Sequence, residues 1–493
     1  MKGREKMKKN SKQILAFALL ISVVMSLSAC GNKKSGKSDS ESTDIVWYVM
    51  GSRQKDQDAV MDEINKKLNE KYQLNLELNV VDSGAYSDKM NMIMASNTEY
   101  DLCWTSNWSN PFSTAAESGA FYKLDELLAG ECKGLFDALP EFVWDDAKVK
   151  NEIYAVPNYQ VYYHQGAIYI PTNLVEKYNI DTQSIKSLYD LEPVLKILKE
   201  KEPDLYTFNP NDFAGSTLKD YHTFNNASFL AVKEGDADFN ILSTHELPEY
   251  YKEIELYRDW YNQGYIRKDI VSAVNESSAD TSALRYAVWF SSIKPGIDAI
   301  NLKNFGEPIT TIPLRTPLIK PNAGQATMNA VSNSSENPAK ALKLLEVMNT
   351  DKEIYNMMCF GIEGTHYEKI SENTVRTIEN NGKTYNPNKD WVFGNQFNAY
   401  VREGQSENVW EETDRINRES EKSPLRGFNI DFSNIKSEVA KINAILSEYN
   451  YIYLGAEEPK KSWDERIEKL KTAGIDKVIE EVQRQIDEWK ATK

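Results

Sequence analysis

The 493-residue chain is poor in the residues and motifs that most recognisable catalytic and metal sites require. It has four cysteines and four histidines, and no two histidines share the H-E-x-x-H spacing of zinc hydrolases. The sequence also lacks the G-x-S-x-G turn of serine hydrolases, a phosphate-binding P-loop and the G-x-G-x-x-G turn of dinucleotide-binding folds. We therefore predict a protein that is not an enzyme and that needs neither a cofactor nor a metal.

Glycine and proline are scarce, and positive charge is in the minority. The 23 glycines and 17 prolines argue against a fibrous or low-complexity chain. Lys and Arg number 58 against 74 Asp and Glu, which gives a net charge of −16. Because an acidic surface repels phosphate backbones, we expect no nucleic-acid partner. The hydrophobic fraction of 41% is sufficient for a packed core, and the length predicts two or more domains, or two lobes in one chain.

The first 29 residues are typical of a secretion signal. Six Lys and Arg and one Glu lie within the first twelve residues, and an uncharged run over 14–29 follows them. That run has 16 residues, fewer than the about 20 that a membrane-spanning helix needs. It ends in Leu27-Ser28-Ala29-Cys30, which resembles the lipobox of bacterial lipoproteins, where the cysteine is lipidated and the chain is cut just before it. The alternative is an ordinary signal peptide with an accidental cysteine.

We accordingly predict a signal peptide over 1–29, an acyl (palmitate) anchor on Cys30 and a flexible tether over 30–44 that contains no large apolar side chain before Ile45. The three remaining cysteines, Cys103, Cys132 and Cys359, are far apart and odd in number. No disulfide framework is expected from such spacing, so we interpret them as core thiols.

Hydrophobic periodicity predicts an α/β fold for the body. Ile45–Met50, Leu74–Val80 and Tyr100–Trp104 have the pattern of strands, and segments of helical spacing separate them. A β-α-β-α-β opening indicates a parallel sheet with covering helices. Ligands of such sheets bind beyond the carboxyl ends of the strands, which are here Gly51-Ser52 and the polar loop Thr105–Trp108.

The last sixty residues are predicted to form helices that pack on the body, since each has a single apolar stripe. Val478, Val482 and Ile486 lie on one such stripe. Ser462–Glu465 fits a capping box at the start of one helix, and Gly474 is placed to end it.

Short stretches in a specific order and spacing carry a family resemblance: Tyr100-Asp101-Leu102, Ile153–Pro157 and Ser334–Ala341. With the lipobox and the tether, they resemble the extracellular solute-binding lipoproteins of bacterial ABC importers, in the carbohydrate-type group (family 1). From about Asn349 onward the chain is similar to a subgroup with a distinctive C-terminal region of unknown function.

The resemblance implies an α/β, two-lobed fold like that of periplasmic binding proteins (type II), with discontinuous lobes joined by hinge crossings. Such proteins bind the ligand between the lobes and close by hinge bending. We expect lobe I over 45–160 plus 325–360, lobe II over 165–320 plus 385–493 including the C-terminal helices, and crossings near 159–169, 313–324 and 361–367.

The resemblance also implies a receptor for a sugar or oligosaccharide that is handed to the transmembrane subunits of an ABC permease. We expect a monomer, lipid-anchored on the outer face of the membrane of a bacterial, Gram-positive cell. A binder of peptides or other polar solutes is an alternative, because the same architecture serves both. An extracellular glycosidase is a further alternative, although no pair of carboxylates stands out among the 74 acidic residues.

Aromatic residues beside small polar ones predict where the sugar binds. Sugar rings have apolar faces and hydroxyl edges, which flat aromatic side chains with polar neighbours match. Trp104 ends a buried strand and is expected in the core, and the core remains the alternative for each of the other tryptophans. From loop position and side-chain chemistry, the predicted ligand-binding residues are Ser106, Asn107, Trp108, Tyr159, Trp289, Ser291, Glu363, Trp391 and Asn395.

The lipid anchor is directly testable in a Cys30→Ala variant. Acyl chains supply the membrane affinity, and Cys30 is the one thiol next to the predicted cleavage point. We expect the variant to lose its lipid and to escape processing at residue 29, as read by labelled fatty acid and the mass of the secreted chain. Incorporation of the label into the variant would show that the assignment is wrong.

Overall fold

A computed structural model of the chain describes residues 42–96, 98–211, 220–224, 226–378 and 382–491. The predicted signal peptide, Cys30 and the tether up to residue 41 lie outside these residues, and their predictions stay predictions. Across the described ranges no helix combines the length and the apolar composition needed to cross a membrane.

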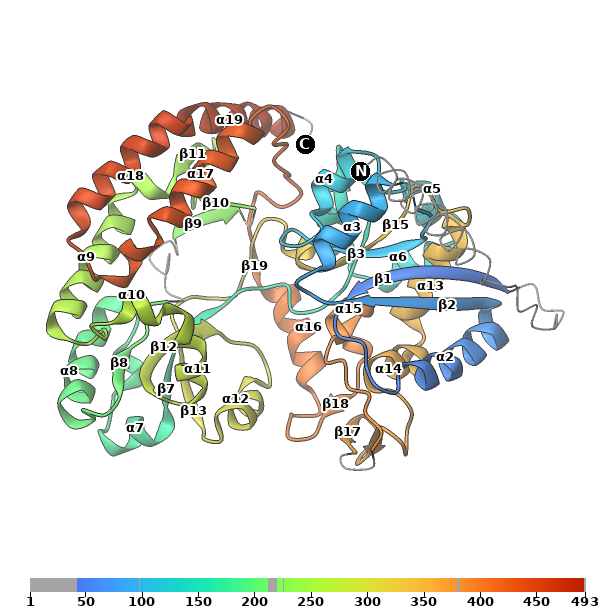
Figure 1. Cartoon of the computed structure of the whole chain (residues 1–493), viewed down its shortest axis with the longest axis horizontal. Coiled ribbons are helices and arrows are strands. Elements are labelled where there is room, and N and C mark those ends of the chain that lie inside the picture. Colours follow the sequence, from blue (N-terminus) through green and yellow to red (C-terminus); the bar gives the residue numbers. More distant parts are fainter. Residues whose placement is uncertain (1–41, 97, 212–219, 225, 379–381, 492–493) are drawn as a thin grey trace, which may run out of the picture. The chain divides into compact units, whose positions relative to one another are not determined.

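The first lobe is built on a five-stranded sheet with the order β2-β1-β3-β15-β6 (Figure 1). Its first three strands are parallel, which confirms the predicted β-α-β-α-β opening. β15 and β6 come from later in the chain, and β15 is antiparallel to both β3 and β6. The strands are β1 (Thr43–Met50), β2 (Leu74–Val81), β3 (Leu102–Thr105), β6 (Val156–Pro157) and β15 (Met328–Val331).

Helices of the first lobe share one hydrophobic core with this sheet. In α2, Val60, Ile64 and Leu68 recur at helical spacing and are fully buried. The helices are α2 (Gln57–Tyr72), α3 (Tyr86–Ala95), α4 (Phe112–Glu117), α5 (Asp125–Ala129), α6 (Lys133–Ala138), α13 (Pro338–Thr350), α14 (Lys352–Phe360), α15 (Asp390–Phe393) and α16 (Val409–Glu419). Short strands complete the lobe: β4 (Lys148–Val149), β5 (Glu152–Ile153), β16 (Tyr367–Lys369), β17 (Thr374–Thr377) and β18 (Val401–Arg402).

The second lobe contains two sheets with separate cores. A four-stranded sheet has the order β13-β7-β12-β8, in which only β12 and β8 are parallel. Its elements are β7 (Gly166–Pro171), α7 (Thr172–Lys177), α8 (Glu192–Lys201), β8 (Tyr206–Phe208), α9 (Pro248–Gln263), α10 (Ile270–Ala273), α11 (Ser277–Ser282), β12 (Tyr286–Ser292), α12 (Ile297–Phe305) and β13 (Ile309–Pro313). A three-stranded antiparallel sheet consists of β9 (Tyr221–Phe224), β10 (Ala227–Lys233) and β11 (Ile241–Ser243).

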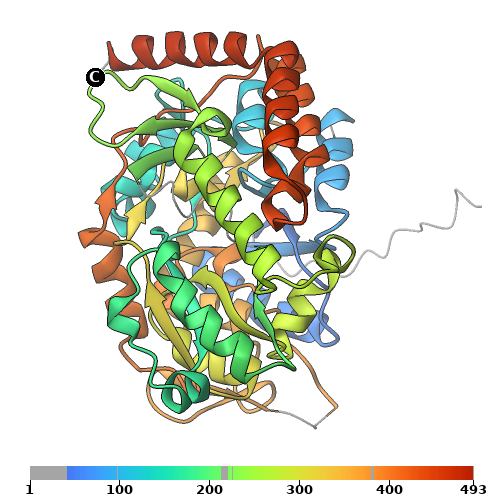
Figure 2. The same ribbon diagram turned by 90° about the vertical axis from the view of Figure 1, so that its left-hand side faces the viewer.

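The C-terminal helices pack on the three-stranded sheet, as Figures 1 and 2 show. They are α17 (Lys436–Glu448), α18 (Pro459–Ala473) and α19 (Ile475–Lys490). The predicted stripe of Val478, Val482 and Ile486 is fully buried, which confirms that these helices belong to the body. The predicted capping box is wrong, because α18 begins three residues earlier, with Pro459 in its first turn and no side-chain cap. Gly474 ends α18 in a left-handed conformation, as predicted.

Three chain segments pair with one another where the chain passes between the lobes. The backbones of His164 and Leu318 exchange two hydrogen bonds, of 2.9 and 3.1 Å. β14 (Leu318–Ile319) pairs in parallel with β19 (Glu421–Lys422), which lies between the two sheets (Figure 1). The predicted crossings near 159–169 and 313–324 therefore contain paired strands at this position.

The third predicted crossing, near 361–367, is wrong. Tyr367 is buried in the core of the first lobe, where its ring packs against Phe360 and Tyr400. The boundary of lobe II at residue 385 also needs correction, because Tyr385 and Phe393 belong to the same core. The chain remains in the first lobe through α16 and leaves it at β19.

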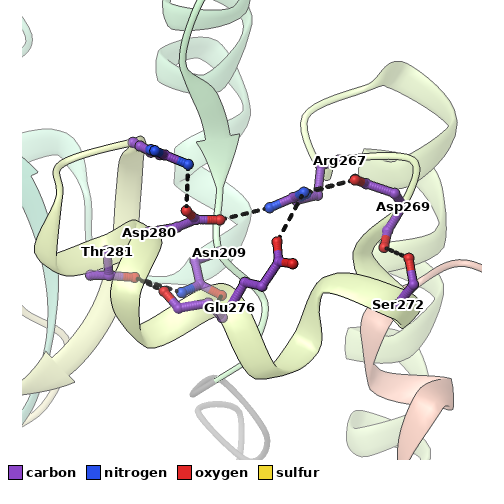
Figure 3. Close-up of polar contacts among 9 residues, drawn as sticks. Asn209, Arg267, Asp269, Ser272, Glu276, Asp280 and Thr281 are labelled. Atoms are coloured by element: carbon purple, nitrogen blue, oxygen red, sulfur yellow. Dashed lines mark hydrogen bonds and ion pairs between the residues drawn. The ribbon is translucent and has the colours of Figure 1, made fainter.

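A network of ion pairs fixes the turn after α9 in the second lobe (Figure 3). The Arg267 guanidinium lies 2.7 Å from Asp280 and 2.6 Å from Asp269, and the side chains of Arg267 and Asp280 are each only 7% exposed. The guanidinium also lies 4.0 Å from the ring centre of Tyr206 on β8. These contacts attach α11 and the turn after α9 to the edge strand of the sheet.

An amide and two hydroxyls extend this network at the end of β8 (Figure 3). Asn209 donates a hydrogen bond to Thr281 and accepts one from the Ser277 hydroxyl, both at 3.0 Å. Because these groups satisfy one another, we assign the network a structural role.

Arg267→Met should destabilise the fold. The substitution leaves Asp280 buried with the exposed Arg285 as its remaining cation, and breaking a buried ion pair costs about 3–5 kcal/mol. We expect a loss of that order in the free energy of unfolding measured in urea. Arg376→Met is the control, since its pairs with Glu403 and Glu368 are exposed and should matter little. Equal losses in the two variants would contradict the structural role of the Arg267 network.

Candidate functional site

Three tryptophans meet at the carboxyl end of β3. The ring centres of Trp104 and Trp108 are 5.2 Å apart, those of Trp104 and Trp391 are 5.9 Å apart, and those of Trp108 and Trp391 are 6.4 Å apart. Trp104 is fully buried, as predicted, whereas Trp108 is 57% exposed and Trp391 is half-buried. A buried ring thus supports two rings that reach solvent. We call Trp104, Trp108 and Trp391 the tryptophan platform.

The loop after β3 holds Trp108 through hydrogen bonds of Ser106. The Ser106 hydroxyl accepts from the backbone N–H groups of Trp108 and Ser109 and donates to the Ser109 carbonyl at 2.8 Å. The Trp108 indole N–H donates to the carbonyl of Ala326 at 2.9 Å. The ring is therefore fixed at its polar edge, while most of its apolar surface is open to a ligand.

A buried polar network holds Trp391 against the platform. The Thr327 hydroxyl donates to the Trp391 carbonyl and accepts from the Trp104 indole N–H, both at 2.8 Å. The Asn158 amide donates to Thr327 at 2.9 Å and to the Trp391 carbonyl at 3.1 Å, and Asn329 donates to the Asn158 side chain at 3.0 Å. Asn158, Thr327 and Asn329 are each 1% exposed. We call these three residues the polar network.

Gly394 allows the segment that carries Trp391 to approach α13 closely. A Cβ atom at this position would lie 2.8 Å from the carbonyl oxygen of Met348, closer than side chains pack. Asn395, which follows, uses its side-chain oxygen to accept from the backbone N–H of Phe397 at 3.1 Å. This predicted ligand residue thus shapes the turn after Trp391.

Positive charge lies close to the platform. The Lys389 Nζ is 4.8 Å from the ring centre of Trp391. Lys294, in the turn after β12, comes from the other lobe: partial burial lowers its pKa, and the Asp390 carboxylate acts in the opposite direction. The Lys294 side chain nevertheless reaches solvent. Lys294 is thus an exposed cation whose charge interacts with Asp390, the residue that precedes Trp391.

Other predicted site residues lie elsewhere. Trp289 is 4% exposed and packs between Tyr169 and Phe305 in the second lobe, so neither face of its ring is open to a sugar, and the prediction that it stacks is wrong. Ser291 follows it on β12 and pairs with Ala167 in the sheet. Glu363 lies at the surface 3.5 Å from Lys369 and makes no contact with the platform.

Tyr159 is also buried in the protein interior and does not reach the surface of the platform. Its side chain is 3% exposed, its hydroxyl donates to Asp414 at 2.5 Å, and its ring centre lies 4.5 Å from that of Phe397. Desolvation raises the pKa of the Tyr159 hydroxyl. Of the predicted residues, the structure thus brings together Ser106, Asn107, Trp108, Trp391 and Asn395. Ser106 is buried, and the other four are at least partly exposed to solvent.

Sequence reasoning missed Lys389 and the polar network. No local pattern marks Asn158, Thr327 or Asn329, because the partners of each are about 60 to 280 residues away in the chain. The useful signal was the recurrence of tryptophan beside small polar residues, from which two of the three platform rings were predicted to bind the ligand.

The described part of the chain holds no cluster of three His, Cys, Asp or Glu side chains suited to a metal ion. Cys103, Cys132 and Cys359 are buried and unpaired, in agreement with the prediction of core thiols. Burial raises the pKa of Cys103 to about 12 and that of Cys132 to about 11, so these thiols are not reactive at neutral pH.

Comparison with known proteins matches most of the chain. Residues 51–354 match the family described as bacterial extracellular solute-binding protein, and residues 424–491 match a domain of unknown function (DUF3502). The chain is 30% identical to a carbohydrate ABC transporter substrate-binding protein of Streptococcus pneumoniae, over 98% of this chain and 99% of the relative. It is 22% identical to lipoprotein LipO of Bacillus subtilis, over 93% and 96%.

A solved structure of a solute-binding protein is also similar to this chain. The crystal structure of the N-glycan transport solute binding protein (NgtS) of S. pneumoniae has a TM-score of 0.78 and 28% identity to this chain, over 91% of this chain and 100% of that one. NgtS has also been solved in complex with Man1GlcNAc and with Man5GlcNAc. The likeness extends over both lobes and the C-terminal helices.

Thr327→Val tests whether the polar network positions the platform. The change removes the acceptor of the buried Trp104 indole N–H and one donor to the Trp391 carbonyl, and an unsatisfied buried polar group costs about 1–3 kcal/mol. We expect a loss of that order on urea unfolding, with a changed near-ultraviolet circular dichroism of the tryptophans. Thr350→Val, which removes an exposed hydroxyl, is the matched control. An unchanged spectrum with wild-type stability would argue against the network.

Proposed function

Because the chain belongs to the bacterial extracellular solute-binding protein family, we propose that it is the substrate-binding component of an ABC importer and captures a sugar or oligosaccharide for uptake. The ligand is held between the two lobes and passed to the transmembrane subunits of a permease. A two-lobed binding protein can close on its ligand by hinge bending. The pairing of β14 with β19 between the lobes supports a hinge at these strands.

The tryptophan platform is the observation that carries the proposal. An exposed Trp108 ring, anchored at its indole N–H and backed by a buried ring, offers a flat apolar surface that loses little conformational entropy on binding. The half-buried Trp391 lies beside it at an interplanar angle of 46°, so the two rings can contact two differently inclined faces of a saccharide. Asn107, which is half-buried and directly precedes Trp108, supplies an amide for hydroxyl groups.

The relatives support a carbohydrate over a peptide. The S. pneumoniae relative that is 30% identical is a carbohydrate ABC transporter substrate-binding protein, and NgtS binds mannose-containing glycans in its crystal structures. A platform of aromatic rings suits sugar faces, whereas a peptide receptor needs groups that pair with the backbone and the termini.

We further propose that Cys30 anchors the receptor to the outer face of the cell membrane. The lipobox ending at Cys30 supports the anchor, and the name of the LipO relative is consistent with it. Residues 30–44 then act as the tether between the lipid and the first strand.

A receptor releases its ligand unchanged, which separates it from a glycosidase. Incubation of the protein with oligosaccharides, followed by mass spectrometry of the sugars, should recover the starting compounds. Hydrolysis that persists in repurified protein would replace the receptor proposal with an enzymatic one.

Trp108→Ala should weaken carbohydrate binding while leaving the fold intact. The variant loses a stacking contact worth about 0.5–1.5 kcal/mol together with the apolar area buried by the sugar, so the dissociation constant should rise about tenfold or more. Titration calorimetry with Man5GlcNAc, the glycan bound by NgtS, and with a panel of neutral oligosaccharides measures the change.

Two variants serve as controls for this experiment. Tyr189→Ala removes another exposed aromatic ring, far from the platform in sequence, and should bind as the wild type does. Trp289→Ala should cost about 3–5 kcal/mol of stability because that ring is buried, with unchanged affinity in the folded fraction. Wild-type affinity in Trp108→Ala would remove the platform from the binding site.

A further inference from the structure

Three segments of the chain meet at Gln165, next to the crossing between the lobes. Its backbone carbonyl accepts from the N–H of Ile293 at 2.9 Å, and its side-chain amide donates to the carbonyl of Arg315 at 3.0 Å. The preceding residue, His164, pairs with Leu318 on β14. The hydrogen-bonded backbone groups at this junction belong to Ile293, Arg315 and Leu318. Three cationic residues are therefore at most two positions from one of these groups: Lys294, Arg315 and Lys320.

Among the residues that the structure describes, no carboxylate lies within ion-pairing distance of Arg315 or Lys320. The buried Arg315 Nε–H also has no hydrogen-bond acceptor there. Lys320 directly follows β14 (Leu318–Ile319), the strand whose Leu318 pairs with His164. Both side chains are half-buried.

The surrounding charges act differently on the two cations. Desolvation lowers the pKa of Lys320, and the other charge that acts on it is Arg315, of the same sign. Desolvation also lowers the pKa of Arg315. The carboxylates of Glu421, Glu234 and Asp220, which lie beyond ion-pairing distance, raise it in part. Desolvation, with Lys320 and Arg315 in addition, lowers the pKa of His164 to about 4, so this imidazole is neutral at physiological pH.

Two like charges in a partly desolvated place are unfavourable unless an anion joins them. The arrangement is unexpected in a chain with 16 more negative than positive charges, since carboxylates are abundant enough to pair with every surface cation. Of the two cations, Arg315 presents a planar fork of donors and Lys320 a point charge, which together suit a carboxylate or a sulfate group.

We infer that Arg315 and Lys320 form an anion subsite at the crossing, and that the ligand of this receptor is an acidic saccharide that carries a carboxylate or a sulfate group. The inference rests on the proposed function for the saccharide part of the ligand. The platform binds the apolar face of a sugar, Lys294 contributes positive charge between the platform and the crossing, and the subsite takes the anionic substituent.

The test uses the mature protein and sodium D-glucuronate as the probe, with D-glucose plus sodium chloride at equal ionic strength as the neutral reference. We expect glucuronate to raise the melting temperature by roughly 1–3 °C above the reference, and Lys320→Met to weaken the apparent affinity for glucuronate by about tenfold or more. Lys320→Arg, which keeps the charge, should retain most of the response. Lys340→Met, an exposed lysine on α13, should respond as the wild type does.

Sodium sulfate in place of glucuronate distinguishes the two anionic groups. Sulfate also stabilises proteins by exclusion from their surface, so only the part of its effect that Lys320→Met removes counts as binding. A response to glucuronate alone assigns a carboxylate, and a larger Lys320-dependent response to sulfate assigns a sulfate ester. Equal melting temperatures in glucuronate and in the reference, or an equal response in wild type and Lys320→Met, would overturn the subsite.

Failure of the subsite and failure of the proposed function give different results. Neutral oligosaccharide binding that depends on Trp108, without any Lys320-dependent anion effect, overturns the subsite and leaves the receptor in place. A Lys320-dependent anion effect in a protein that binds no saccharide, neutral or acidic, would leave an anion site and overturn the carbohydrate receptor.

Discussion

The hydrogen bonds of Asn158, Thr327 and Asn329 are the constraint on which the candidate site depends. Each of these side chains is buried, and together they connect three segments that are distant in sequence: the end of β6, the strand β15 and the segment at Trp391. Buried amides and hydroxyls are costly when unpaired, so the network specifies one arrangement of these segments. The position of the tryptophan platform follows from it.

Sequence periodicity predicted the elements of the first sheet and of the C-terminal helices well. The strand at Leu74–Val80 and the stripe over Val478–Ile486 depend on local spacing, and the structure has them where they were expected. The capping box at Ser462 failed because Pro459, a favourable first-turn residue, starts the helix earlier. The third crossing was misplaced because aromatic packing around Tyr367 is a tertiary feature with no local pattern.

The candidate site was predictable only in part. Trp108 and Trp391 could be predicted as members of the candidate site because a sugar-binding ring needs small polar neighbours, which can be seen directly in the sequence. The same pattern gave a wrong prediction for Trp289, which was expected to stack on a sugar. Its polar neighbours lie in a strand, and the ring is buried against Tyr169. Whether a ring is buried in the core or exposed to a ligand depends on which residues pack against it. Those residues are often distant in the sequence, so a local pattern does not reveal them. The sequence likewise does not reveal that Arg315 and Lys320 have no ion-pair partner, because this depends on the three-dimensional arrangement of the strands around them.

The first lobe is held together by contacts between residues that are far apart in the sequence, and this affects the order in which the protein folds. The indole N–H of Trp47 on β1 bonds to Asn329, 282 residues later, and residues near 390 complete the same core. Closing a loop of that length is entropically costly and slow, so the N-terminal part of the lobe lacks the inner antiparallel strand β15 until most of the chain is available.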